Sequence, residues 1–177
     1  TSPPYFGLRS YLPDDHPDKH LEQGTEETPA EYVARMVAVF HEIHRVLADD
    51  GTLWLNVSDT YTSRADSAAS ETRGRARTAA MSPRQDTAST LGVKQLLGIP
   101  WRLAFALQDD GWILRSEIIW AKPNPNPEKV KDRPTSSHEQ VFLMTKKRRD
   151  YFYDWTAIAE DSSATADRPQ LVRARQL

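Results

Sequence analysis

The first five residues of the chain, Thr1-Ser2-Pro3-Pro4-Tyr5, combine hydroxyl groups, two prolines and an aromatic ring. Proline fixes its own φ and pushes the preceding residue toward extended conformations, so Ser2 and Pro3 favour a rigid, extended backbone. The Ser2 hydroxyl and the backbone carbonyls are then held as hydrogen-bond acceptors, while Tyr5 offers a flat face for stacking. This combination suits the binding of a planar amine, although Ser-Pro-Pro also occurs in ordinary loops.

The composition narrows the class of protein. The chain has 177 residues, the size of one domain, and a net charge of −2, so any contact with nucleic acid must come from local patches. It has no cysteine, which excludes disulfides, thiolate metal ligands and a thiol nucleophile. No apolar run approaches the roughly 20 residues of a membrane span and no signal peptide is visible, so we expect a cytoplasmic protein.

The elements that position the first residues begin with a helix. Thr28-Pro29-Ala30-Glu31 has the pattern of a capping box and is followed by an apolar stripe at helical spacing, which predicts a helix that ends at Asp49-Asp50-Gly51. Residues 52–58 follow, apolar on both faces in their first half, as is typical of a strand in a covered parallel sheet. Residues 6–27 are a polar, acidic loop.

The second half of the chain predicts a helix over residues 96–108 and strands over 112–121 and 140–145. The loop that joins these strands is rich in proline and asparagine and has no helical pattern, so the two strands most simply form an antiparallel pair. The order helix, strand, helix, strand indicates an α/β fold.

Five segments, in this order, give the chain a resemblance to the circularly permuted N-4 cytosine/N-6 adenine DNA methyltransferases, in which the catalytic motif comes first. They are Thr1–Tyr5, Asp50–Asn56, Gly98–Ala104, Ile118–Asn124 and Arg133–Glu139.

The resemblance implies the Rossmann-like fold of S-adenosylmethionine-dependent methyltransferases, here the catalytic part of the sheet with a reversed final strand. Residues 1–150 would form a partial catalytic domain, and 151–177 the start of a target-recognition or connecting region. The family's Gly-rich cofactor motif is absent, since the seven glycines are scattered. Residues 60–91 are expected to be a mobile loop, either a solvated insertion or a loop that embraces DNA.

The resemblance implies that the chain would transfer a methyl group from S-adenosylmethionine to the exocyclic amino group of a flipped-out base. Ser2, Pro3, Pro4 and Tyr5 would be catalytic, with Ser2 and Pro3 also bordering the cofactor. Serine at position 2 favours cytosine N4 over adenine N6, which stays the alternative.

Other residues are candidates for contact with the base or the DNA: Lys122, Asn124, Arg133, His138 and Glu139. A solvated loop is the alternative for Lys122 and Arg133. No metal site is expected, because His138 and Glu139 would point to opposite faces of a strand.

Several other basic, histidine and tryptophan side chains are expected to serve the fold or the surface. The basic run 146–149 either contacts phosphates or closes a strand, and His41 and His44 are expected to face solvent. Four tryptophans are expected in the core: Trp54, Trp101, Trp112 and Trp120.

The expected partner is double-stranded DNA, with a cognate restriction endonuclease as a further candidate. Two alternatives remain open: a methyltransferase for RNA or for a glutamine side chain, and a truncated remnant that only binds DNA.

Overall fold

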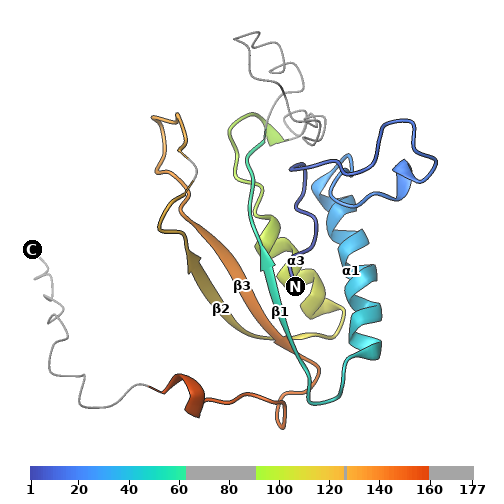
Figure 1. Ribbon diagram of the computed structural model, residues 1–177, viewed down its shortest axis with the longest axis vertical. Coiled ribbons are helices and arrows are strands. Elements are labelled where there is room, and N and C mark those ends of the chain that lie inside the picture. Colours follow the sequence, from blue (N-terminus) through green and yellow to red (C-terminus); the bar gives the residue numbers. More distant parts are fainter. Residues whose placement is uncertain (63–90, 126, 160–177) are drawn as a thin grey trace, which may run out of the picture.

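A three-stranded sheet with the strand order β1-β3-β2 forms the centre of the structure (Figure 1). The computed structural model describes residues 1–62, 91–125 and 127–159. Its elements are, in chain order, η1 (Lys19–Leu21), α1 (Pro29–Val46), β1 (Thr52–Val57), α3 (Ile99–Asp109), β2 (Ile113–Ala121), β3 (His138–Thr145) and η3 (Thr156–Ile158). In this part of the chain no helix has the length and apolar character needed to cross a membrane.

Strand β3 runs antiparallel to both of its neighbours. The predicted antiparallel pair, β2 with β3, is therefore confirmed, and β3 is the reversed strand of the sheet. In the register of the sheet, Val141 of β3 lies between Asn56 of β1 and Ile118 of β2. Side chains at these three positions consequently share one face, since residues directly opposite each other point the same way.

The core lies between the sheet and the two long helices, which both cover the same face of the sheet (Figure 1). Helices and strands each contribute an apolar stripe with their own period, as expected for an α/β layer. The α/β fold class is thus confirmed. Fully buried side chains from both helices and from β1 and β3 meet there: Met36 and Phe40, Leu55 and Val57, Leu103 and Leu107, Phe142 and Met144.

The opposite face of the sheet carries exposed aromatic residues, and here two predictions are wrong. β1 is not buried on both faces, because Trp54 is 41% exposed. Of the four tryptophans expected in the core, only Trp112 is buried; Trp101 and Trp120 are 37% and 61% exposed. For Trp54 and Trp120 the physical reason is that, within the described residues, both long helices pack on the other face. Trp101 is not on the sheet but on α3, where its ring packs edge-on against Phe142 and stays partly exposed.

The ends of the helices explain where the boundaries fall. The capping box at α1 is confirmed: the Thr28 hydroxyl accepts from the Glu31 N–H at 3.2 Å, and the Glu31 carboxylate accepts from the Thr28 N–H. Helix α3 begins three residues later than predicted, because Leu97 bonds back to the Thr60 carbonyl. The Asp59 carboxylate instead accepts from the N–H groups at the start of α3, Gly98 and Ile99, at 3.0 Å each.

The acidic loop 6–27 makes hydrogen bonds and an ion pair within itself around one buried side chain. Glu22 is buried and accepts hydrogen bonds from the Tyr11 and Leu12 N–H groups, and it pairs with Lys19. Burial acts to raise the Glu22 pKa, but these hydrogen bonds outweigh it and lower the pKa to about 2. The loop is therefore fastened around a charged carboxylate.

Two further predictions concern surface groups. His44 does not simply face solvent: its ring packs edge-on against Trp112, with 4.8 Å between the centroids, whereas His41 is exposed. In the basic run 146–149, Lys146 donates to the Leu47 carbonyl at 2.8 Å, so this residue closes the end of α1. Most of the predicted loop 60–91 and the end of the segment 151–177 lie outside the described residues.

Candidate active site

The first residue, Thr1, lies against the edge strand β1 at the chain end marked N in Figure 1. The Thr1 amino group donates to the Trp54 carbonyl at 2.8 Å, and the Asn56 N–H donates to the Thr1 carbonyl at 2.9 Å. This is the hydrogen-bond pattern of neighbouring parallel strands. It fixes the start of the Ser-Pro-Pro-Tyr segment to the strand that carries Asn56.

The Tyr5 hydroxyl is the centre of a polar cluster. It lies 2.8 Å from Asn56 Oδ1, 3.2 Å from Ser2 Oγ and 3.3 Å from Glu139 Oε2. Burial, with a contribution from the Glu139 carboxylate, raises the Tyr5 pKa above its usual value, so the hydroxyl keeps its proton at neutral pH. Three segments far apart in the sequence therefore meet at one hydrogen-bond donor.

Contacts from α1 and from the acidic loop hold the backbone of the Ser-Pro-Pro-Tyr segment in place. The buried Tyr32 of α1 donates from its hydroxyl to the Pro4 carbonyl at 2.9 Å. Gly24 packs directly against the segment, and a Cβ atom there would lie 2.9 Å from the Tyr5 carbonyl oxygen. Gly7 also donates to the Gly24 carbonyl at 2.8 Å, which holds the acidic loop in this place.

Of the residues predicted around the base, Lys122 and Glu139 join the site. The Lys122 ammonium and the Glu139 carboxylate form a hydrogen-bonded ion pair, and the Glu139 side chain is only 14% exposed. Lys122 directly follows β2, and Glu139 is the second residue of β3. The Lys122 N–H also donates to the Ser137 carbonyl, which holds these two strand ends together. The pair thereby links the last two strands to Tyr5.

Three other predicted residues are not part of this cluster. Asn124 lies exposed in the loop after β2, and His138 is exposed at the first position of β3. Arg133 pairs with Glu128 at 2.7 Å and lies over the Tyr61 ring, 3.8 Å from its centroid. Their proposed contacts with base or DNA remain predictions.

A pocket of about 590 Å³ opens beside Ser2 on the sheet face that the long helices leave uncovered. Its walls combine the polar groups of the cluster with apolar and aromatic side chains, as small-molecule sites generally do. The lining residues are Thr1, Ser2, Trp54, Asn56, Ile118, Trp120, Glu139 and Val141.

Sequence reasoning missed Asn56 as a site residue and assigned Trp54 and Trp120 to the core. A signal for Asn56 was present, since it is a lone amide within the apolar run of β1. Buried amides need hydrogen-bond partners, so such a residue marks a polar neighbour. The partner itself, Tyr5, is 51 positions away and could not be read from the pattern.

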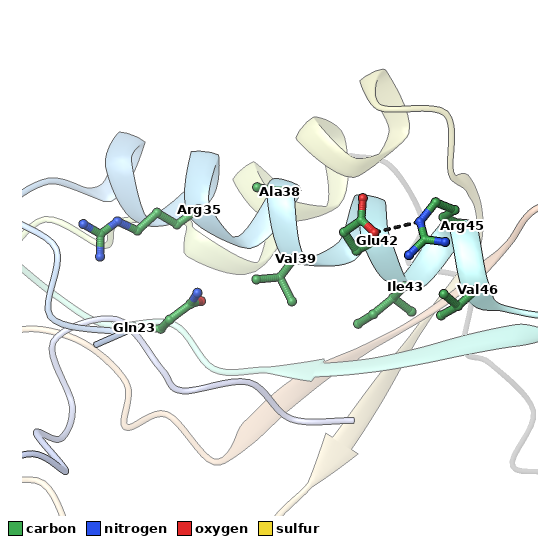
Figure 2. Close-up of a pocket in the computed structure, with 8 residues that line it drawn as sticks. All are labelled: Gln23, Arg35, Ala38, Val39, Glu42, Ile43, Arg45 and Val46. Carbon is green, nitrogen blue, oxygen red and sulfur yellow. Dashed lines mark hydrogen bonds and ion pairs between the residues drawn. The ribbon is translucent and has the colours of Figure 1, made fainter. Parts of the chain in front are cut away.

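A second depression of about 600 Å³ lies on the outer face of α1 (Figure 2). Val39, Ile43 and Val46 form its apolar part, and Arg45 pairs with Glu42 at its rim. None of the candidate site residues lines it. Of these two depressions, only the pocket beside Ser2 is lined by candidate site residues.

Comparison with known proteins gives close relatives. The chain is 50% identical to the type II methyltransferase M.Cfr9I of Citrobacter freundii, over 93% of this chain and 52% of the relative. It is 53% identical to M.XycI of Xanthomonas campestris pv. cyanopsidis (90% and 51%) and 48% identical to M.SmaI of Serratia marcescens (92% and 53%). The chain thus spans about half the length of the curated relatives it matches.

Among solved structures, the chain is similar to a DNA modification methylase from Thermus thermophilus complexed with S-adenosyl-L-methionine. That similarity has a TM-score of 0.48 and 16% identity, and it covers 86% of this chain and 46% of the other. A family model described as DNA methylase matches residues 1–170. Because this match includes almost the whole chain, the chain belongs to the N6/N4 DNA methylase family.

Proposed function

We propose that this chain forms the catalytic part of a DNA methyltransferase that methylates the exocyclic amino group of a flipped-out base. The observation that carries the proposal is the Ser2 hydroxyl, held 3.2 Å from the Tyr5 hydroxyl at the edge of the pocket. The names of the relatives, type II methyltransferases, support the same activity.

The residues of the segment meet the chemical need of the reaction. An exocyclic amino group is a poor nucleophile, because its lone pair is delocalised into the ring. The Ser2 oxygen and the Pro3 carbonyl would accept its two N–H groups, which favours a tetrahedral nitrogen with a localised lone pair. Tyr5 would stack on the base, and one N–H proton would leave to solvent after transfer. Positioning is thus the main contribution of the protein.

S-Adenosylmethionine, when bound, supplies a methyl group on a sulfonium, and a nitrogen–carbon bond forms as the carbon–sulfur bond breaks. The pocket fits part of such a ligand, because the exposed rings of Trp54 and Trp120 suit a cationic group. Ser2 and Pro3 would border it. No Gly-rich cradle is present in the sequence, so these residues would hold only part of the cofactor.

We further propose cytosine N4 as the target, with adenine N6 as the alternative. Serine at position 2 supports cytosine, following the family pattern. The substrate would be double-stranded DNA, and taking a base out of the stack costs a few kcal/mol, which contacts to the extruded base must offset.

The test is a methyl-transfer assay on the protein encoded by the complete open reading frame that contains this chain. Radiolabelled S-adenosylmethionine and unmethylated DNA are supplied, and the product is digested to nucleosides. N4-Methylcytosine is the expected product. N6-Methyladenine would keep the reaction and overturn the choice of base, and no transfer to DNA would overturn the proposed function.

The Ser2→Ala variant of the same protein assigns the reaction to this site. We expect turnover to fall about 100-fold, as for the loss of one group that contacts the transition state, with little change in DNA affinity. The matched control is Tyr11→Phe, which alters a tyrosine that is 63% exposed, and should leave both quantities unchanged. Equal losses of turnover and affinity in Ser2→Ala would contradict the role of Ser2 as amine acceptor.

A further inference from the structure

A serine hydroxyl can both donate and accept hydrogen bonds, so its usefulness as an acceptor depends on where its own proton points. If the Ser2 proton faced an incoming amino group, it would meet the N–H donors of the base and repel them. The reaction therefore needs a group that holds this proton away from the substrate. The contacts around Ser2 contain such a group.

The direction of the hydrogen bonds is set from a backbone carbonyl. The Gln140 carbonyl can only accept, and the Asn56 Nδ2 lies 3.3 Å from it. The Asn56 amide is consequently oriented with its Oδ1 toward Tyr5, at 2.8 Å from the Tyr5 hydroxyl. Because Oδ1 has no proton, the Tyr5 hydroxyl must donate.

The direction of the hydrogen bond between Ser2 and Tyr5 follows from the same count of donors and acceptors. With its proton given to Asn56, the Tyr5 oxygen can act only as an acceptor toward Ser2 Oγ, 3.2 Å away. The Glu139 carboxylate, 3.3 Å from the Tyr5 hydroxyl, is a second acceptor for the same proton, and donation to either group leaves Tyr5 without a proton for Ser2. The Ser2 proton is thus committed to Tyr5, and the Ser2 lone pairs stay free.

We propose that the Tyr5 hydroxyl and Asn56 are positioning residues, which act through Ser2 by fixing its oxygen as an acceptor for the amino group of the base. This inference rests on the proposed function and adds a role for two groups to it. Neither group needs to touch the reacting nitrogen. Their effect on the reaction must therefore disappear when the Ser2 hydroxyl is absent.

A double-mutant cycle in the complete protein tests this dependence. Tyr5→Phe removes one oxygen and keeps the ring, so we expect turnover to fall about 10-fold with an unchanged KM for DNA. In the Ser2→Ala background, Tyr5→Phe should cause no further loss. Losses that multiply would show that the Tyr5 hydroxyl acts independently of Ser2 and would overturn the proposal.

Two variants at Asn56 test the acceptor itself. Asn56→Asp keeps an oxygen that accepts from Tyr5, although it loses the N–H bond to the Gln140 carbonyl, and should retain turnover to within about threefold. Asn56→Ala leaves only the Glu139 carboxylate, 3.3 Å away, to accept the Tyr5 proton, so it should lower turnover by more than Asn56→Asp and by less than Tyr5→Phe. Equal losses in Asn56→Asp and Asn56→Ala would overturn the proposal, because the shared acceptor would then have no effect.

Two further measurements distinguish a positioning role of the Tyr5 hydroxyl from a role in folding. They also distinguish failure of this inference from failure of the proposed function. Thermal unfolding and DNA affinity by fluorescence anisotropy should be similar in wild type and Tyr5→Phe, and a matching loss of affinity would contradict positioning through Ser2. Absence of transfer by the wild type would overturn the proposed function along with the inference. An active wild type with multiplicative losses would overturn the inference alone.

Discussion

Gly24 connects the acidic loop to the Ser-Pro-Pro-Tyr segment at the scale of single atoms. Its φ of +89° lies in the region that favours glycine, and an added Cβ would lie 2.9 Å from the Tyr5 carbonyl oxygen and 3.3 Å from the Pro4 Cβ. The segment cannot retreat easily, since Tyr32 holds the Pro4 carbonyl. The absence of a side chain at Gly24 therefore allows the acidic loop to pack closely against the Ser-Pro-Pro-Tyr segment.

We predict that Gly24→Ala lowers the free energy of unfolding by about 1–2 kcal/mol from its backbone conformation alone, and by about 1–3 kcal/mol more from the contact with the segment. Chemical denaturation measures this. The matched control is Gly92→Ala, where φ is +75° and no atom of the described residues lies within 4 Å of the added Cβ. Equal losses at the two positions would show that the segment moves freely.

Glu22 gives the structure a dependence on pH. Its pKa is lowered from 4.5 to about 2, so the charged form stabilises the fold. That contribution is fully present above pH 4.5 and is lost as the pH falls toward 2, because protonation weakens the hydrogen bonds from Tyr11 and Leu12 and ends the ion pair with Lys19.

We expect Glu22→Gln to be less stable than wild type by about 1–3 kcal/mol at pH 7, since it weakens hydrogen bonds to a charged group. Below pH 4.5 the difference should shrink, which thermal unfolding at a series of pH values would detect. Glu27→Gln, at an exposed position in the same loop, should follow the wild-type curve. A constant difference at all pH values would contradict the assignment to Glu22.

At the scale of elements, Asp59 joins the end of β1 to the start of α3. Its carboxylate accepts from the Gly98 and Ile99 N–H groups, which otherwise have no partner within the helix. Asp59→Ala should therefore cost about 1–2 kcal/mol of stability, as loss of a helix cap does. Asp15→Ala, at an exposed position, is the control in the same denaturation experiment, and equal stability of the two variants would contradict the capping role.

The sequence was sufficient where the signals are local. The capping box of α1, both long helices and all three strands follow from patterns within a few residues, and β3 as the reversed strand follows from the loop that precedes it. For the site, the Ser-Pro-Pro-Tyr segment is recognisable because four further segments of the family pattern follow it in the right order.

The remainder depends on distant contacts. Asp59 caps a helix that starts 40 positions later, and no local pattern predicts this. Trp120 was expected in the core because tryptophan is apolar, but its strand leaves one face uncovered by the described helices. Glu22 reads as a solvated acid until the hydrogen bonds that surround it are known.

At the scale of the whole molecule, the sheet face that the described helices leave uncovered is an exposed apolar surface. Trp54, Ile118 and Trp120 lie there, between 36% and 61% exposed, whereas soluble monomers rarely expose large contiguous apolar patches. This chain on its own should therefore show tryptophan fluorescence that responds strongly to solvent.

We predict that acrylamide quenches a variant that retains only Trp120 much more than one that retains only Trp112, because their exposures are 61% and 1%. Replacement of the other tryptophans by phenylalanine gives the two proteins, and a Stern–Volmer plot gives the comparison. Similar quenching constants would mean that the sheet face is covered in solution.

The hydrogen bonds that orient the Ser2 proton end at a backbone carbonyl, that of Gln140, and this has a consequence for sequence variation. Every residue type supplies such a carbonyl, so position 140 is free to change. Relatives with serine at the place of Ser2 should keep an acceptor at the place of Asn56. Relatives with aspartate there should not need one, since an ionised carboxylate has no proton to direct. The residue types at positions 2 and 56 should therefore covary among relatives, because only a serine at position 2 has a proton to orient.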